Sequence, residues 1–194
     1  MEHWRYYLHG RLLEAFNQRE SAVREYLAAL RVQPAFHRAA NRAAYMLASL
    51  GRFAEAEPYF DAVLRSEPGN AAAHFNLGYT YDKRGQHAKA VAAFREAVRL
   101  NPKLDRAWYG MGLSHAALGQ HDEAAKALHE AATLQPMNPH AWYALGMAYH
   151  TLHNPDKVNQ VVMHLLRFDP RMTRRLIHDA GRSDLAHLVK DLVV

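Results

Sequence analysis

The chain has 194 residues, of which 49% are hydrophobic and 22% are charged, with no cysteine and a formal net charge of +5 at pH 7. This length allows one ordinary domain or one elongated array of repeats. The lack of cysteine excludes disulfides, iron–sulfur clusters, thiolate zinc sites and a cysteine nucleophile, and no apolar run approaches the roughly 18–20 residues that span a bilayer.

The positive charge is mild and is spread along the chain. A nucleic-acid-binding protein usually concentrates its charge into a stripe, so we expect no nucleic-acid partner. The first residues lack the apolar core of a signal peptide, and no membrane insertion is expected. We therefore expect a cytoplasmic protein, unless a leader or anchor has been removed from the chain.

A proline recurs every 34 residues, at Pro34, Pro68, Pro102, Pro136 and Pro170. A fixed period of this length is typical of stacked structural repeats. The period divides the chain into five blocks, 3–36, 37–70, 71–104, 105–138 and 139–172, and a C-terminal segment, 173–194.

Each block predicts a hairpin of two helices. Positions 4, 7, 8 and 11 of a block share one face of a first helix, and positions 20, 24 and 27 form the matching face of a second. Position 8 is occupied by Gly10, Ala44, Gly78, Gly112 and Gly146. Glycine inside a helix is unfavourable, so its recurrence opposite alanine at position 20 predicts that the two helices approach closely.

The ends of the helices are also marked in the sequence. Glycine at position 15 (Gly51, Gly85, Gly119) predicts a left-handed cap at the end of the first helix, and Asn17 and His153 occupy this position in two other blocks. In the fifth block, Asn154 and Pro155 are typical of an N-cap and a first helical residue.

The fifth block and the residues after it depart from this pattern. Val158 and Leu165 are bulkier than their counterparts, so we expect a slightly wider hairpin. Beyond it, we expect one helix near 173–180, a break at Gly181 and a second helix with Ser183 as its N-cap. Apolar residues of this segment predict a cap over the end of the stack; these are Leu176, Ile177, Leu185, Leu188, Val189 and Leu192.

The columns of the alignment resemble the tetratricopeptide repeat (TPR) family. The match is best in residues 71–104, which contain Asn76, Leu77, Gly78, Tyr81, Gly85, Ala90, Phe94, Ala97 and Pro102. The first two blocks depart most, because His9 replaces the usual leucine and Ala43 and Ala44 replace Leu-Gly. The resemblance implies an all-α fold, a right-handed superhelical solenoid of antiparallel helix hairpins, and the compact repeats without insertions resemble bacterial members.

No motif in the sequence predicts catalysis. Residues 112–116 resemble a nucleophile elbow, but the interior of a helix cannot provide the strand–turn–helix that the elbow needs. His150 and His153 have helical i, i+3 spacing, with no third ligand apparent. We expect a protein that is not an enzyme, with no catalytic residue, metal site or cofactor.

The resemblance implies a binding groove. In TPR arrays the first helices line a concave surface through positions 2, 5, 6, 9, 12 and 13. Here these positions hold aromatic, Arg and Asn side chains, which dominate many protein interfaces. The candidate peptide-binding residues are Tyr7, Arg11, Arg38, Asn41, Arg42, Tyr45, Phe75, Asn76, Tyr79, Lys83, Arg106, Tyr109 and Tyr143.

The chemistry of these residues indicates an acidic ligand. Arg outnumbers acidic residues on this face, so we expect an extended or C-terminal peptide that carries Asp, Glu or a free carboxylate. We assign polar contacts to Arg42, Asn76 and Arg106, and apolar anchoring to Tyr45, Tyr79 and Tyr109. Aromatics at positions 5 and 9 also brace adjacent repeats, so packing is the alternative role for some of them.

The sequence thus supports two functions. The leading hypothesis is a non-catalytic scaffold or adaptor that binds an extended segment of another protein. The clamp of TPR domains that bind heat-shock chaperone tails matches only at Asn76 and Arg106, which argues against a chaperone cofactor. The alternative is a self-assembling structural protein that forms homo-oligomers through its repeat ends, because the first block begins with Trp4, Tyr6, Tyr7 and Leu8 and no capping segment.

Overall fold

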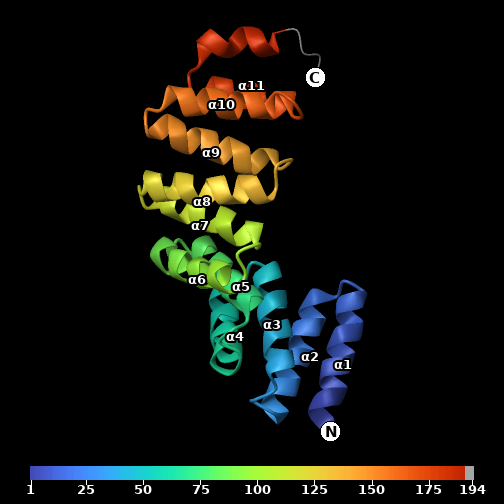
Figure 1. Cartoon of the computed structure of the whole chain (residues 1–194). Helices are drawn as coiled ribbons and strands as arrows, with labels where there is room; N and C mark the ends of the chain where they lie inside the picture. Colours follow the sequence, from blue (N-terminus) through green and yellow to red (C-terminus); the bar gives the residue numbers. More distant parts are fainter. Residues whose placement is uncertain (191–194) are drawn as a thin grey trace. The chain divides into compact units, whose positions relative to one another are not determined.

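A computed structural model of the chain describes residues 1–190, and all regular secondary structure in that range is helical. Figure 1 shows the helices in chain order. The α-helices are α1 (Glu2–Ala15), α2 (Arg19–Val32), α3 (His37–Ser49), α4 (Phe53–Ser66), α5 (Ala71–Lys83), α6 (His87–Leu100), α7 (Asp105–Ala117), α8 (His121–Leu134), α9 (Pro139–Thr151), α10 (Pro155–Leu165) and α11 (Pro170–Asp179), followed by a short 3-10 helix, η1 (Ser183–Val189). The predicted all-α helical-repeat fold is confirmed. Within residues 1–190, no helix is both long enough and apolar enough to cross a membrane.

The helices form two compact units. Unit 1 is Met1–Asn101, with α1 to α6, and unit 2 is Pro102–Val194, with α7 to η1. The repeat pattern predicts a single array and gives no signal for this division. The proline-containing segment 101–104 resembles segments 67–70 and 135–138, which lie within the units.

The glycine at position 8 packs against the second helix of its own hairpin, as the pattern predicts. A Cβ added to Gly10 would lie 2.7 Å from Cε1 of Tyr26, and one added to Gly78 would lie 2.8 Å from Cδ1 of Phe94. The closest neighbour is therefore the large residue at position 24 rather than the alanine at position 20. The missing Cβ makes room for a buried ring.

The turns between the helices have the predicted left-handed residues. Gly51, Gly85 and Gly119 have φ angles of 76°, 70° and 72°, and Asn17 and His153 have φ angles of 58° and 52°. The Asn154 side chain accepts a hydrogen bond from the backbone N–H of Lys157 at 3.1 Å, which is the predicted N-cap. These local signals set where the hairpins turn.

A ring N–H at position 4 repeatedly binds the backbone oxygen of the recurring proline. Trp108 Nε1 donates to Pro102 O and Trp142 Nε1 donates to Pro136 O, each at 2.9 Å. His74 Nε2 lies 3.0 Å from Pro68 O. These bonds attach the first helix of a hairpin to the loop before it, so the position-4 rings have a structural role.

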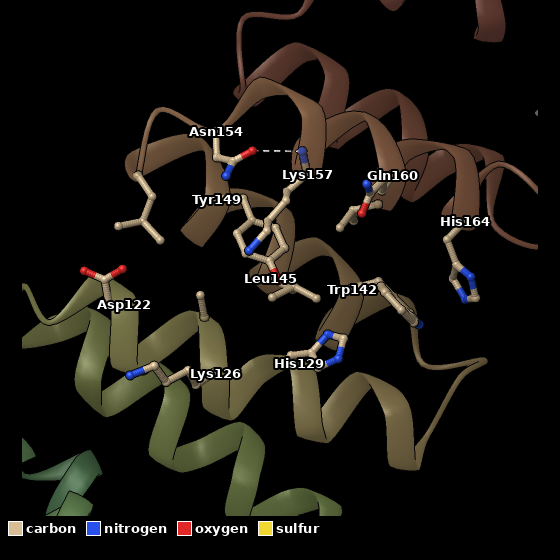
Figure 2. Close-up of a pocket in the computed structure, with 13 residues that line it drawn as sticks. Asp122, Lys126, His129, Trp142, Leu145, Tyr149, Asn154, Lys157, Gln160 and His164 are labelled. Carbon is tan, nitrogen blue, oxygen red and sulfur yellow. Dashed lines mark hydrogen bonds between the residues drawn. The ribbon is translucent and has the colours of Figure 1, made fainter.

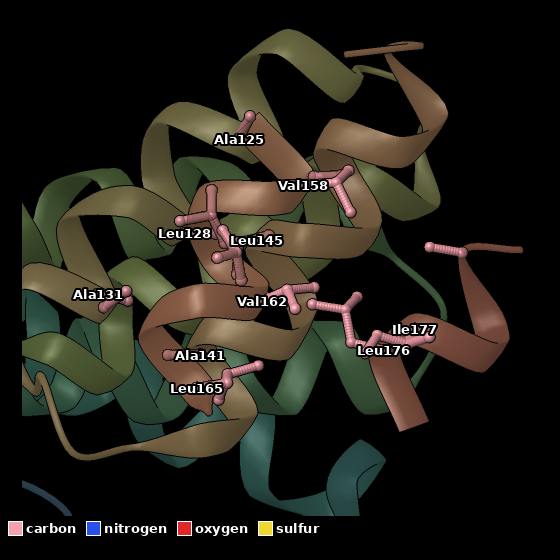
Figure 3. Close-up of a cluster of buried hydrophobic side chains, with 14 of the residues drawn as sticks. Ala125, Leu128, Ala131, Ala141, Leu145, Val158, Val162, Leu165, Leu176 and Ile177 are labelled. Carbon is pink, nitrogen blue, oxygen red and sulfur yellow. The ribbon is translucent and has the colours of Figure 1, made fainter. Parts of the chain in front are cut away.

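The fifth hairpin differs from the others in what packs against its glycine. Figure 3 shows Val162 and Leu176 among the buried side chains of this unit. A Cβ added to Gly146 would lie 2.6 Å from Cδ2 of Leu176, and its three nearest atoms all belong to Leu176, so the glycine of α9 packs closest to α11. The residue at position 24 is Val162, which is shorter than the tyrosine, phenylalanine or leucine of the other glycine-containing hairpins. Leu176 fills the space that this shorter side chain leaves.

The C-terminal helices also differ from the prediction. Helix α11 begins at Pro170, three residues before the predicted start, because Asp169 Oδ1 accepts the backbone N–H of Met172 at 2.8 Å and caps the helix. The last helix is a 3-10 helix with Arg182 rather than Ser183 at its N-cap position. Gly181 breaks the chain between them with a φ of 63°. The predicted capping residue Leu192 lies outside the described residues.

Candidate peptide-binding surface

The first helices of unit 1 gather most of the candidate residues on one surface. We call the side of α1, α3 and α5 that carries these candidate residues the first-helix face. Helices α3 and α5 contact each other directly, and an ion pair between Arg42 and Glu14 joins α3 to α1. The candidates on this face are Arg11, Arg38, Asn41, Arg42, Tyr45, Phe75, Asn76, Tyr79 and Lys83.

Glu14 holds two helices and the core together at one edge of this face. The Tyr26 hydroxyl donates to Glu14 Oε2 at 2.6 Å, and Arg42 Nη1 donates to Glu14 Oε1 at 3.0 Å. Arg11 Nε lies 3.9 Å from the same carboxylate. Burial, together with the bond to Glu14, raises the pKa of Tyr26, so its hydroxyl remains a donor. Arg42 is thus already paired with an acidic residue of its own chain.

Two other cations on the face have aromatic neighbours instead. Arg38 Cζ lies 5.6 Å from the centre of the Trp4 ring, and Lys83 Nζ lies 5.3 Å from the centre of the Tyr79 ring. Within residues 1–190 neither forms an ion pair. A cation over a ring keeps N–H groups that can donate to a carboxylate. Arg38 and Lys83 can therefore bind an acidic ligand.

The aromatic candidates of unit 1 divide into exposed and packed residues. Tyr45 and Tyr79 are 49% and 42% exposed. Phe75 is half-buried against the Phe94 ring. Tyr7 is only 8% exposed and packs with the rings of Trp4, Phe36 and Tyr26. Tyr7 is therefore a core residue.

Two amides complete the face. Asn41 is exposed on α3, and Asn76 is half-buried on α5. In the described part of the chain the Asn76 carboxamide forms no hydrogen bond, whereas its backbone oxygen accepts one from Thr80 at 2.8 Å. A carboxamide can donate to and accept from the backbone of a bound peptide.

The candidates in unit 2 are mostly engaged within the unit. The Tyr143 hydroxyl donates to Asp179 Oδ2 at 2.7 Å, and Arg175 Cζ lies 4.9 Å from the centre of its ring. Tyr109 is half-buried against the hydrophobic cluster of this unit, and burial raises the pKa of its hydroxyl. Both tyrosines thus have contacts within the unit, while Arg106 is exposed.

Unit 2 also contains a pocket that the sequence did not predict. Its volume is about 730 Å³, and α8, α9 and α10 supply its walls and floor (Figure 2). The Trp142 ring stacks on the His164 ring with centroids 3.9 Å apart, and Lys157 Nζ lies 4.9 Å from the centre of the Tyr149 ring. The sequence does not indicate these residues as a site. Positions 4 and 11 of a block, which hold Trp142 and Tyr149, are expected in the core of the hairpin. Lys157 and His164 lie on a second helix, outside the expected groove.

Comparison with known proteins places the fold. A sequence profile described as tetratricopeptide repeat matches residues 7–66, 47–105 and 109–157, well over half of the chain. No curated protein sequence matches this chain.

Several solved structures share the fold. A crystal structure of YrrB, described as a TPR protein with an unusual peptide-binding site, is 24% identical, with a TM-score of 0.79 over 91% of this chain and 90% of YrrB. MamA from Desulfovibrio magneticus RS-1 is 21% identical, with a TM-score of 0.77 over 91% of this chain and 96% of that one. PilF from Pseudomonas aeruginosa is 17% identical, with a TM-score of 0.72 over 95% and 87%. Together with the profile match, the fold shows that this chain belongs to the tetratricopeptide repeat family.

Proposed function

We propose that the protein is a non-catalytic adaptor, and that the first-helix face of unit 1 binds an extended acidic segment of a partner protein. The observation that carries this proposal is the position of Arg38 and Lys83. Both cations lack a carboxylate partner in the described chain, and both lie on the same face as the exposed rings of Tyr45 and Tyr79. YrrB, a TPR protein with a peptide-binding site, supports the class of ligand.

The cations on the first-helix face are of two kinds: some pair with an acidic residue of the chain, and others are available to a ligand. Glu14 neutralises much of the charge of Arg42, and this ion pair joins α3 to α1, while Arg11 lies 3.9 Å from Glu14 within α1. Arg38 and Lys83 have no such acid, and Asp82, next to Lys83, faces His87 at 3.1 Å. A ligand carboxylate therefore gains most by contacting Arg38 or Lys83.

An extended peptide fits this arrangement better than a folded surface does. A peptide backbone that leaves water needs replacement hydrogen bonds, because an unpaired buried donor or acceptor is costly. The carboxamides of Asn41 and Asn76 can supply them, and the exposed tyrosines can pack against its apolar side chains. The ring contacts hold both cations before binding, which reduces the entropy lost when the complex forms.

Binding to a peptide array tests the proposal. The array carries twelve-residue peptides in three matched sets, with Asp and Glu retained, changed to Asn and Gln, or changed to Lys. Labelled wild-type protein is expected to bind the first set preferentially. For the strongest acidic peptide, Arg38→Glu/Lys83→Glu is expected to lower affinity by at least about tenfold at physiological salt, because two attractive charges become repulsive.

The matched control is Arg31→Glu/Arg95→Glu, which makes the same charge change at exposed sites on α2 and α6. This variant is expected to retain wild-type affinity. Equal losses in the two variants would mean that net charge alone attracts the peptide. No loss in either variant would remove the first-helix face as the binding site.

Other expectations remain predictions. They include a contribution to binding from Arg106, Tyr109 and Tyr143, a cytoplasmic location, and the division into five repeats over residues 1–172 with a capping segment from residue 173.

A further inference from the structure

We propose that a second copy of this chain docks on the outward face of α1, and that two α1 helices pack antiparallel across a two-fold axis. Three apolar side chains one helical turn apart form this surface, which is called the α1 stripe below. Leu8, Leu12 and Phe16 are 60%, 55% and 71% exposed. Trp4, 38% exposed, continues the stripe by one more turn.

The repeat itself indicates that a helix belongs on this surface. Leu12 occupies position 10 of its block, and the same position holds Met46 in α3, Thr80 in α5 and Ala148 in α9. Those side chains are 4%, 0% and 6% exposed. Each lies on a first helix that packs against the second helix before it: α3 on α2, α5 on α4, and α9 on α8. Within residues 1–190, helix α1 packs against α2, and no helix covers this surface of α1.

The side chains at this surface differ from those of the later hairpins in a way that favours another α1. At position 10 the internal hairpins carry Met46, Thr80 and Ala148, and the preceding helix covers each of them. Helix α1 instead exposes Leu12, with Leu8 and Phe16 beside it, and these side chains can interdigitate with another apolar ridge. The α1 stripe of a second copy is such a ridge.

An antiparallel arrangement centred between Leu8 and Leu12 is self-complementary. It places Leu8 of one copy against Leu12 of the other, and Trp4 against Phe16, and the two-fold axis repeats each contact. The N-terminal Glu2 of one copy then lies near Arg19 of the other. Opposite charges thus meet at both ends of the helix pair, and Arg11, which lies near the axis, has Glu14 of its own chain 3.9 Å away.

The expected association is weak. A helix of 14 residues is about 21 Å long, so a pair of such helices buries less than the roughly 800 Å² per partner of a typical stable complex. Dimerisation should therefore appear between about 1 and 300 μM protein.

Sedimentation velocity over this concentration range tests the inference. Wild type is expected to shift from monomer to dimer, and Leu8→Lys/Leu12→Lys is expected to remain monomeric throughout. The control Met137→Lys/Met163→Lys changes two exposed apolar residues of unit 2 and should dimerise like wild type. A monomeric wild type at the highest concentration, or a dimer that survives the α1 double variant, would overturn the proposal.

Cysteine crosslinking tests the antiparallel arrangement and does not depend on the lysine variants. The natural chain has no cysteine, so each introduced thiol is unique. Oxidation of an equimolar mixture of the single variants Leu8→Cys and Leu12→Cys is expected to give a covalent dimer several-fold faster than either variant alone, because residue 8 faces residue 12 of the other copy. Equal rates for the mixture and for each variant alone would contradict this geometry.

Discussion

At the scale of single residues, one helical turn decides whether an aromatic side chain packs or is free to bind. The aromatics at position 5, among them Tyr7 and Tyr143, are buried or half-buried, and Tyr143 is also hydrogen-bonded to Asp179. The tyrosines at position 9, Tyr45 and Tyr79, are nearly half exposed. Position 9 therefore supplies the aromatic contacts of the proposed site, and position 5 braces the repeats.

The contact between Tyr143 and Asp179 makes the stability of unit 2 depend on pH. Hydrogen bonds, first from the Tyr143 hydroxyl and then from the His178 ring, lower the pKa of Asp179. A lowered folded pKa stabilises the protein above the unfolded value of about 3.9, and this stabilisation is lost as pH falls through the folded value. The melting temperature of wild type should exceed that of Asp179→Asn at neutral pH, and the difference should shrink below about pH 3.9. A difference that stays constant with pH would contradict the ionised contact.

At the scale of helices, the position-8 glycines set how closely a hairpin closes. In the hairpin of α5 and α6, Gly78 lies against the buried Phe94 ring, and its helix has no room for a larger residue. In the fifth hairpin the position-8 glycine packs against a different helix, because Gly146 lies against Leu176 of α11. The same repeat position therefore provides the close contact in a regular hairpin and the close contact with the C-terminal helix.

Replacement of Gly78 by valine tests the close approach. The added Cβ would lie 2.8 Å from Phe94, and overpacking of this kind lowers the free energy of unfolding by about 1–3 kcal/mol. Gly69→Val is the control, because no heavy atom lies within 4 Å of its added Cβ, and it should change stability by less than about 0.5 kcal/mol. Chemical denaturation measures both. Equal effects would mean that α5 does not approach α6 closely.

A double-mutant cycle tests the partner of Gly146. Gly146→Val and Leu176→Ala should each destabilise unit 2, but the cavity left by Leu176→Ala accommodates the new valine. The coupling energy should therefore be about 0.5–3 kcal/mol. The cycle of Gly146→Val with Val162→Ala should be additive within about 0.5 kcal/mol. Coupling to Val162 and none to Leu176 would mean that Gly146 packs against α10 of its own hairpin and not against α11.

The sequence predicted what depends on local chemistry and missed what depends on distant neighbours. The left-handed Gly51 and the N-cap Asn154 follow from their own neighbourhoods and were predicted. The partner of Gly146 was not, because it depends on the length of Val162 and on a helix that begins at Pro170. The types of residue on the binding face were also predictable. The neutralisation of Arg42 was not, because Glu14, 28 residues away, binds it.

At the scale of the whole molecule, each unit contains a hydrophobic cluster of its own. One cluster joins buried residues from Tyr7 to Leu77, all in unit 1, and another joins buried residues from Ala125 to Val189, all in unit 2. Two such cores allow the two halves of the chain to differ in stability.

The isolated fragment 1–101 is expected to fold. Its cluster contains large side chains that are fully buried, among them Tyr26 and Phe60. Circular dichroism should show helical structure that melts cooperatively, and the same fragment with Gly78→Val should melt at a lower temperature. A fragment without a cooperative transition would mean that unit 1 requires the rest of the chain.

The central claim is that the first-helix face binds an acidic peptide, and amide chemical-shift mapping on the full chain tests it most directly. The strongest acidic peptide from the array is titrated into ¹⁵N-labelled protein. We predict that the largest shifts fall in α3 and α5, around Arg38, Tyr45, Asn76 and Lys83, and that they disappear in Arg38→Glu/Lys83→Glu. Shifts concentrated around Trp142 and Tyr149 would instead assign the peptide to the pocket of unit 2 and contradict the claim.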